Sequence, residues 1–252
     1  LRGLWRRGVG AWKAAVQEMG DALAGRSYVA DYVQTLTHEL KSPLSAIRGA
    51  AELLEDAGMP PAERTKFLAN IARETARIQE VVDRMMELTA LESRRALGSM
   101  VPVALRPLLE EVAAGASQAA APRGVRVVLQ VDADAVVEGD AFLLRQAVSN
   151  LLENAVDFSP EGGAVHVALE ATRRDAVVRV TDEGPGVPAY AQGKVFEKFY
   201  SLPRPHTHKK STGLGLSFVQ RIAALHRGGI ALGNRPEGGA VATLRLPRHD
   251  SR

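Results

Sequence analysis

Two stretches of apolar residues at helical spacing constrain the fold of the first part of this chain more than any other feature. Apolar residues recur at intervals of three, four or seven in the first stretch, at Val29, Val33, Leu36, Leu40 and Ile47. The second stretch continues the pattern from Phe67 to Leu91. Such intervals gather apolar side chains on one face of a helix. Because Gly58 to Pro61 breaks the pattern, the sequence predicts two helices joined as an antiparallel hairpin.

This hairpin is too small to cover its own apolar face. Association with a second copy into a four-helix bundle would bury that face, and packing against the rest of the same chain is the alternative. We expect the homodimer, mostly because of the family resemblance described below. Pro43 lies inside the first helix and is expected to bend it.

His38 is placed by the first helix on the side away from the apolar face. At about 100° per residue, its side chain lies about 200° from Leu36 and Leu40, so the imidazole should face solvent. A neutral imidazole has a free lone pair and can act as a nucleophile. A surface histidine without a chemical role is the alternative when this residue is taken alone.

The pattern changes after Gly98 to Pro102, a segment that we expect to be a linker. Apolar runs predict strands at 125–131, 165–171, 177–181 and 240–246. Helical patterns lie at 106–120, 140–157 and 214–227. This order predicts an α/β sandwich, in which helices cover one face of a sheet.

The expected fold class is therefore α plus α/β. The predicted parts are a linker helix over residues 1–26, the hairpin over 27–97 and the sandwich over 98–252. A net charge of +3 with scattered Lys and Arg gives no basic stripe, so we expect no nucleic-acid partner. The chain has no cysteine, which excludes disulfides and thiolate metal sites. No apolar run reaches the length of about 18 residues that a membrane span needs.

Three tracts in the second half of the chain carry polar groups suited to a nucleotide. Asn150 and Asn154 are four residues apart and share a helix face, where their amide oxygens could hold Mg²⁺. Asp182 ends a predicted strand and could accept a hydrogen bond from an exocyclic amine such as that of adenine. The alternatives are a pair of surface amides for the first tract and an ordinary turn for the second.

The third tract, Thr212 to Ser217, opens a predicted helix with two glycines. Backbone N–H groups at such a helix start bind anions, and the glycines let a phosphate approach. The preceding segment, Ser201 to Ser211, is polar and basic, which suits either a lid over phosphates or a disordered loop.

Together and in this order, these tracts resemble the H, N, G1, F and G2 boxes of bacterial sensor histidine kinases. The matching segments are His38–Leu44, Asn150–Phe158, Asp182–Gly186, Phe196–Tyr200 and Thr212–Leu216. The resemblance covers about residues 27–247, and Gln17–Ala24 is similar to the end of a HAMP signalling linker. It implies a dimeric four-helix bundle followed by an ATP-binding domain of the histidine kinase or GHKL type.

The resemblance also implies an activity. The γ-phosphoryl group of Mg-ATP would pass to His38, and from there to an aspartate on the receiver domain of a response regulator. The regulator would dock on the bundle around His38. The chain, which begins at Leu1, would be the cytoplasmic portion of an inner-membrane sensor whose membrane segment lies upstream and is absent here.

Individual residues match the family's functional positions. Glu39 would orient the imidazole of His38 or take its proton, and Ser42 stands where a Thr or Asn positions water for dephosphorylation of the regulator. Asn150 and Asn154 would bind Mg²⁺, Phe158 would pack on the adenine, and Lys198 would lie near the phosphates. The remaining nucleotide contacts would come from Asp182, Gly184 and Gly186 around the base, and from Thr212, Gly213, Leu214 and Gly215 around the phosphates.

The chain departs from the family pattern at two places in the nucleotide site. Asp157 stands where many members carry Lys or Arg, so phosphate binding is expected to depend more on Mg²⁺ and Lys198. Lys210 and Ser211 replace the first glycine of the usual G2 run, which puts the hinge of the loop in doubt.

Two other functions stay open from the sequence. A GHKL ATPase such as gyrase carries a general-base Glu four residues before the Mg²⁺-binding Asn, and here that position is Asn150, which cannot take a proton from water. An inactive dimeric adaptor is the other alternative, although the retention of His38, the asparagines and Asp182 counts against it.

Overall fold

The chain divides into two compact units, Leu1–Val82 and Asp83–Arg252. The computed structural model describes residues 37, 40–93, 97, 100–131, 133–206 and 211–249. His38 and Glu39 lie outside the described residues, as does the linker helix predicted over 1–26. Helix α2 (Pro61–Ser93) begins in the first unit and ends in the second.

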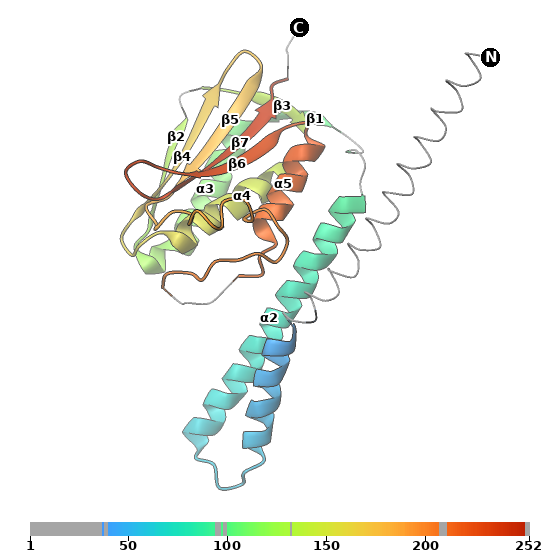
Figure 1. Cartoon of the computed structure of the whole chain (residues 1–252), viewed down its shortest axis with the longest axis vertical. Helices are drawn as coiled ribbons and strands as arrows, with labels where there is room; N and C mark the ends of the chain where they lie inside the picture. The colour runs from blue at the N-terminus through green and yellow to red at the C-terminus, as the bar shows by residue number, and fades with distance from the viewer. Residues whose placement is uncertain are drawn as a thin grey trace, which may run out of the picture. The chain divides into compact units, whose positions relative to one another are not determined.

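The first unit contains the predicted helical hairpin. A helix over residues 40–54 runs through Pro43 and is followed by a turn and then by α2 (Figure 1). In the turn, the backbone N–H of Gly58 donates to Oδ1 of Asp56 at 2.8 Å. Pro61 starts α2, a position where its missing N–H costs no helical hydrogen bond.

Much of the apolar face of the hairpin is exposed. Ala50 and Val81 are buried, but Leu44, Leu53 and Leu68 are each more than half exposed, at 54%, 53% and 54%. Full burial of a leucine side chain contributes about 1.5–3 kcal/mol. The hairpin therefore leaves an apolar surface that a second helical pair would cover.

The second unit is built on a five-stranded sheet with the order β2-β4-β5-β7-β6. Its strands are β2 (Arg126–Val131), β4 (Ala164–Ala171), β5 (Asp175–Thr181), β6 (Gly229–Asn234) and β7 (Ala240–Pro247). The β2–β4 pair is parallel and the other pairs are antiparallel. A separate two-stranded sheet pairs β1 (Val101–Ala104) with β3 (Val136–Gly139).

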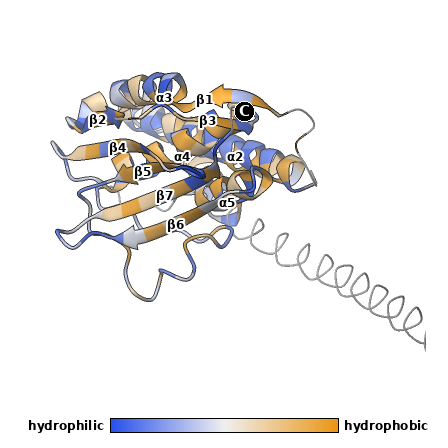
Figure 2. Cartoon of the chain, turned by 90° about the horizontal axis from the view of Figure 1, so that it is seen from above, coloured by the Kyte–Doolittle hydropathy of each residue, from blue (hydrophilic) through white to orange (hydrophobic). Residues whose placement is uncertain are grey.

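Three helices cover one face of the five-stranded sheet, as the two ribbon views show (Figures 1 and 2). They are α3 (Leu105–Ala120), α4 (Ala141–Phe158) and α5 (Gly215–Leu225), and a 3-10 turn, η1 (Ala121–Arg123), follows α3. Helix α4 packs against both α3 and α5. Leu88 and Leu91, from the last turns of α2, are buried in the same core. The α/β sandwich predicted from the sequence is thus confirmed.

Three short strands, β1, β3 and β6, were not predicted. The expected linker over 98–102 is wrong at its end, because Val101 and Pro102 already pair with β3. Strand β1 has four residues and includes a proline, and β6 contains two glycines, so neither shows the apolar alternation that marks a strand. No helix in the described part of the chain is both long and apolar enough to span a membrane.

His226 fixes the start of α4 from the end of α5. Its ring is 3% exposed. Nε2 accepts a hydrogen bond from the backbone N–H of Asp140 at 3.0 Å, and Nδ1 lies 2.8 Å from the carbonyl of Ile222, to which it donates. Asp140 is the N-cap of α4, and its side chain accepts from the N–H groups of Phe142 and Leu143. The neutral ring is therefore part of the framework that positions α4.

Acid is expected to weaken the fold through His226. Burial lowers the pKa of His226, while the Ile222 hydrogen bond and the Asp140 charge act in the opposite direction. In the unfolded chain this histidine has its ordinary pKa of 6.5. Below that pH the unfolded chain binds a proton that the folded protein does not bind. The free energy of unfolding therefore falls by up to about 1.4 kcal/mol per pH unit. Urea unfolding at pH 7.5 and 5.5 should show the advantage of wild type over His226→Gln shrinking at the lower pH. An equal advantage at both pH values would contradict this role.

Candidate functional site

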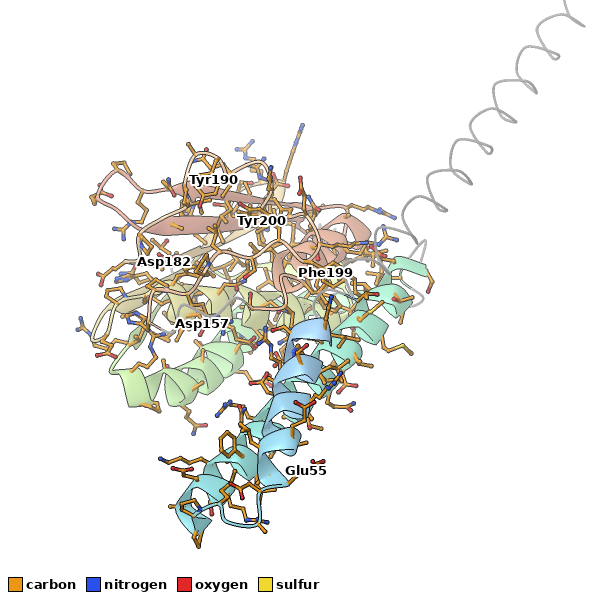
Figure 3. The ribbon with its side chains drawn as sticks, turned by 60° about the horizontal axis from the view of Figure 1, so that its bottom comes forward. Glu55, Asp157, Asp182, Tyr190, Phe199 and Tyr200 are labelled. Atoms are coloured by element: carbon orange, nitrogen blue, oxygen red, sulfur yellow. The ribbon has the colours of Figure 1, made fainter. Side chains whose placement is uncertain are left out.

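A cleft in the second unit has a volume of about 830 Å³, which includes the open space at its mouth. It is lined by α4, β5, β7, the start of α5 and the segments on either side of residues 203–210. Most of the lining side chains are apolar, and Asp182 is the one charged residue among those described. Figure 3 labels Asp182, Phe199 and Tyr200 around this region. The lining residues that the sequence analysis predicted are Asn154, Phe158, Asp182, Gly186, Gly213 and Gly215.

Asp182 presents one carboxylate oxygen to the cleft. It is 7% exposed, and its Oδ1 accepts from the backbone N–H groups of Gly184 at 2.8 Å and Ala240 at 3.1 Å. No hydrogen bond within the described ranges involves Oδ2, so this oxygen can accept from a ligand. Burial raises the pKa of Asp182, against the two backbone hydrogen bonds and the Arg235 charge, which lower it.

The turn after β5 is held by contacts that the sequence did not predict. Asn234, at the end of β6, accepts from the N–H of Val187 at 2.6 Å and donates to its carbonyl at 2.8 Å. Gly239 has φ +87°, and a Cβ there would lie 2.0 Å from the carbonyl oxygen of Asp182. Close backbone packing therefore fixes Asp182, and only the tertiary fold brings Asn234 to the turn that follows it.

Asn150 and Asn154 share one face of α4, as their spacing predicted. Both lie near the start of α5, since a Cβ on Gly215 would be 3.2 Å from Oδ1 of Asn150 and 3.7 Å from Nδ2 of Asn154. Asn154 lines the cleft, whereas Asn150 is 4% exposed and its Nδ2 donates to the carbonyl of Gln146 at 2.9 Å. The amide oxygens are the groups at this site that suit a hard cation.

Arg84 of α2 already uses the amide oxygen of Asn150. Its Nη1 donates to Oδ1 of Asn150 at 2.8 Å, and its Nη2 lies 3.4 Å from Oε2 of Glu153. A cation bound to the same oxygen would face the guanidinium charge. Metal binding at Asn150 therefore requires Arg84 to move away. No sequence signal marked this arginine, because it lies 66 residues from Asn150.

The segment before α5 crosses Phe199 at close range. Gly213 has φ +66°, and a Cβ there would lie 2.4 Å from the backbone carbon of Phe199. The N–H of Phe199, itself at φ 62°, donates to the carbonyl of Gly213 at 2.9 Å. Only glycine fits this crossing. Leu214 is the buried N-cap of α5, and neither it, Thr212 nor Gly184 is among the lining residues.

Lys198 lies outside the cleft lining and forms a salt bridge with Glu92 of α2. Arg221 donates from Nη2 to the carbonyl of Glu92 at 3.2 Å. Burial, and then the charge of Arg221, lower the pKa of Lys198 to about 8. The lysine predicted to lie near the phosphates thus pairs with an acidic side chain in this structure. Ser42 is exposed on the helix over 40–54, in the first unit.

Two family models match the chain. Residues 29–94 match the His Kinase A (phospho-acceptor) domain. Residues 139–250 match the histidine kinase-, DNA gyrase B- and HSP90-like ATPase. The first match contains His38 and the second contains every predicted nucleotide-site residue.

Known proteins match over most of this chain. The sensor protein CreC of Escherichia coli K12 is 41% identical over 236 residues, which cover 93% of this chain and 49% of CreC. The sensor protein QseC of Salmonella typhi is 35% identical, covering 85% of this chain and 46% of QseC. The crystal structure of full-length ShkA in complex with AMPPNP has a TM-score of 0.64 and 28% identity, covering 86% of this chain and 46% of ShkA.

The chain spans about half the length of the curated relatives it matches. Within this chain, residues that match the phospho-acceptor model are followed by an α/β domain that contains the match to the ATPase model. This chain belongs to the family of sensor histidine kinases.

Proposed function

We propose that this chain is the kinase core of a two-component sensor, which transfers the γ-phosphoryl group of ATP to His38 and then to an aspartate of a response regulator. The observation that carries the proposal is the apolar cleft with one free carboxylate oxygen, that of Asp182. An adenine amine can donate to this oxygen while the ring lies among the apolar lining, with Phe158 available to pack on it.

The phosphates would extend toward the start of α5. The glycines at 213 and 215 let the triphosphate approach the backbone N–H groups there, next to Asn154. Among the described residues, no cluster of three or more His, Asp or Glu side chains could hold a metal ion. Two amide oxygens and the phosphates still suit Mg²⁺, which is commonly shared between protein and nucleotide. Bound there, Mg²⁺ would neutralise charge on the triphosphate.

The phospho-acceptor part of the proposal depends on the hairpin. His38 would attack the γ-phosphorus in line, Glu39 would hold the imidazole or take its proton, and Ser42 would support dephosphorylation of the regulator. The exposed leucines of the hairpin support a homodimer with a four-helix bundle. A receiver domain would dock near His38, and an upstream membrane segment in a longer protein would make this chain the cytoplasmic portion of an inner-membrane sensor.

A labelling experiment on the full chain tests the function. Incubation with Mg²⁺ and γ-labelled ATP should yield protein-bound label that is lost in acid and retained in base, and transfer of the label should follow with one receiver domain of a purified panel. Steady release of phosphate without labelled protein would favour a GHKL hydrolase instead. Failure to bind any ATP analogue would favour the inactive adaptor.

A further inference from the structure

The described lining of the cleft contains no positively charged side chain for the triphosphate of ATP. Asp182 is the one charged residue among the described lining residues, and it is negative. Lys198 lies outside the lining and is paired with Glu92. Asp157 adds a second carboxylate to the end of α4. Phosphoryl transfer depends on neutralising the phosphate charge, so a cationic side chain beside the lining would act together with the proposed Mg²⁺.

Arg204 lies beside the cleft and is held by Asp157. It follows the lining residue Leu202 by two positions, and its Nη2 lies 2.5 Å from Oδ2 of Asp157. The two side chains are 33% and 31% exposed, so solvent reaches the pair. Nε of Arg204 is buried with no hydrogen-bond partner in the described part of the chain. The guanidinium thus has donor capacity beyond its contact with Asp157.

The position of Asp157 on α4 brings this arginine close to the predicted phosphate end of the cleft. Asp157 follows Asn154 by three residues and Asn150 by seven, so all three side chains lie on one face of the helix. Three residues correspond to a rise of about 4.5 Å along the helix. Because arginine side chains are long and have several rotamers, a change of rotamer can redirect the guanidinium of Arg204 from Asp157 toward Asn154.

The backbone around Arg204 is anchored on both sides. Oγ of Ser201 lies 2.9 Å from Oγ of Ser211, which joins the two ends of the segment. Nε2 of His206 lies 2.7 Å from the carbonyl oxygen of Ser159, just past the end of α4. Only the side chain of Arg204 therefore needs to move toward the cleft.

We propose that Arg204 binds the polyphosphate of ATP and that Asp157 holds its guanidinium while the cleft is empty. The guanidinium exchanges one anionic partner for another, because a phosphate accepts from its planar N–H groups as a carboxylate does. Asp157 then competes with the nucleotide for Arg204, and its negative charge also repels the phosphates. This inference rests on the proposed ATP binding and names a specificity residue for it.

Calorimetric titration of the full chain tests the exchange with Mg-AMPPNP and with adenosine, which has no phosphate. Arg204→Gln should weaken Mg-AMPPNP binding about tenfold, since it removes one charge-assisted contact, and should leave adenosine binding unchanged. Asp157→Asn should tighten Mg-AMPPNP binding by a few-fold. In the double variant Asp157→Asn/Arg204→Gln, the gain in affinity relative to Arg204→Gln alone should be at most half as large, because Asp157 no longer holds an arginine that could be released.

A matched control and a rescue variant sharpen the result. Arg145→Gln removes one arginine of α4 that pairs with Glu111 at 3.0 Å outside the cleft lining, and it should bind Mg-AMPPNP as wild type does. Asp157→Arg combined with Arg204→Gln should recover most of the lost affinity. Unchanged Mg-AMPPNP binding by Arg204→Gln would overturn the inference. Weaker Mg-AMPPNP binding by Asp157→Asn would also overturn it, because that result would make Asp157 a metal ligand. Failure of wild type itself to bind Mg-AMPPNP would instead refute the proposed function.

Discussion

Replacing His38 by alanine is expected to remove all acid-labile label from the protein while ATP binding stays at the wild-type level. The imidazole is the proposed nucleophile, and the predicted hairpin over residues 27–97 contains no other histidine that could take its place. The described residues that line the nucleotide cleft all belong to the second unit, whereas His38 belongs to the first. Loss of label with intact binding would therefore separate the acceptor from the nucleotide site.

The measurement compares two histidine variants with wild type. After incubation with Mg²⁺ and γ-labelled ATP, label is counted before and after brief acid treatment, and analogue binding is measured by calorimetry on the same samples. His249→Ala is the matched control, because it removes a histidine near the end of β7 whose ring lies 3.4 Å from Glu138. The control should keep its label, and persistence of label in His38→Ala would place the acceptor elsewhere.

The long regular elements could be predicted from the sequence because each depends on a local pattern. The hairpin, three helices and four of the strands follow from apolar spacing over ranges of six to thirty-three residues. Strands β1, β3 and β6 escaped prediction because their short segments contain proline or glycine and show no clear alternation. β1 pairs with β3, which is distant in the sequence, whereas β6 pairs with the next strand, β7. The glycine at 213 carried a signal of its own, as a residue next to a predicted helix start.

No local sequence pattern marked the other residues that complete the site. Asn234 holds the turn after β5, Arg84 occupies the oxygen of Asn150, and Arg204 pairs with Asp157. Each of these contacts joins residues more than 40 positions apart, and each partner is of a type that is common on protein surfaces. The charge of Asp157 was recognised as unusual, but its compensation by an arginine of another segment depends on the tertiary fold.

The substitution Asp182→Asn is expected to weaken ATP binding at least about 100-fold without disturbing the fold. A site that provides a hydrogen-bond acceptor for one ligand group strongly rejects a mismatch at that position. The amide oxygen of the new side chain can still accept from the N–H groups of Gly184 and Ala240, as Oδ1 of Asp182 does. Its NH₂ group would then replace Oδ2 and face the amine of adenine, so two donors would meet in a buried place. Autophosphorylation should fall by the same factor at low ATP concentration.

Asp175→Asn is the matched control, because it makes the same change at the other end of β5, outside the cleft lining. It should bind ATP as wild type does, and thermal melting should show both variants folded. Wild-type affinity in Asp182→Asn would show that the adenine is recognised elsewhere.

The pH dependence of binding gives an independent measure of the same carboxylate. Since burial raises the pKa of Asp182, the carboxylate takes up a proton at a less acidic pH than an exposed aspartate does. The protonated form presents an O–H where the adenine amine needs an acceptor, so the affinity for an ATP analogue should fall as the pH is lowered toward this raised pKa.

Asparagine does not titrate, and the weak residual binding of Asp182→Asn should lack this pH-dependent component. The difference between the two profiles isolates the titration of Asp182 from that of the phosphate groups of the ligand. Parallel profiles for wild type and variant would mean that Asp182 is not the group that pairs with the base.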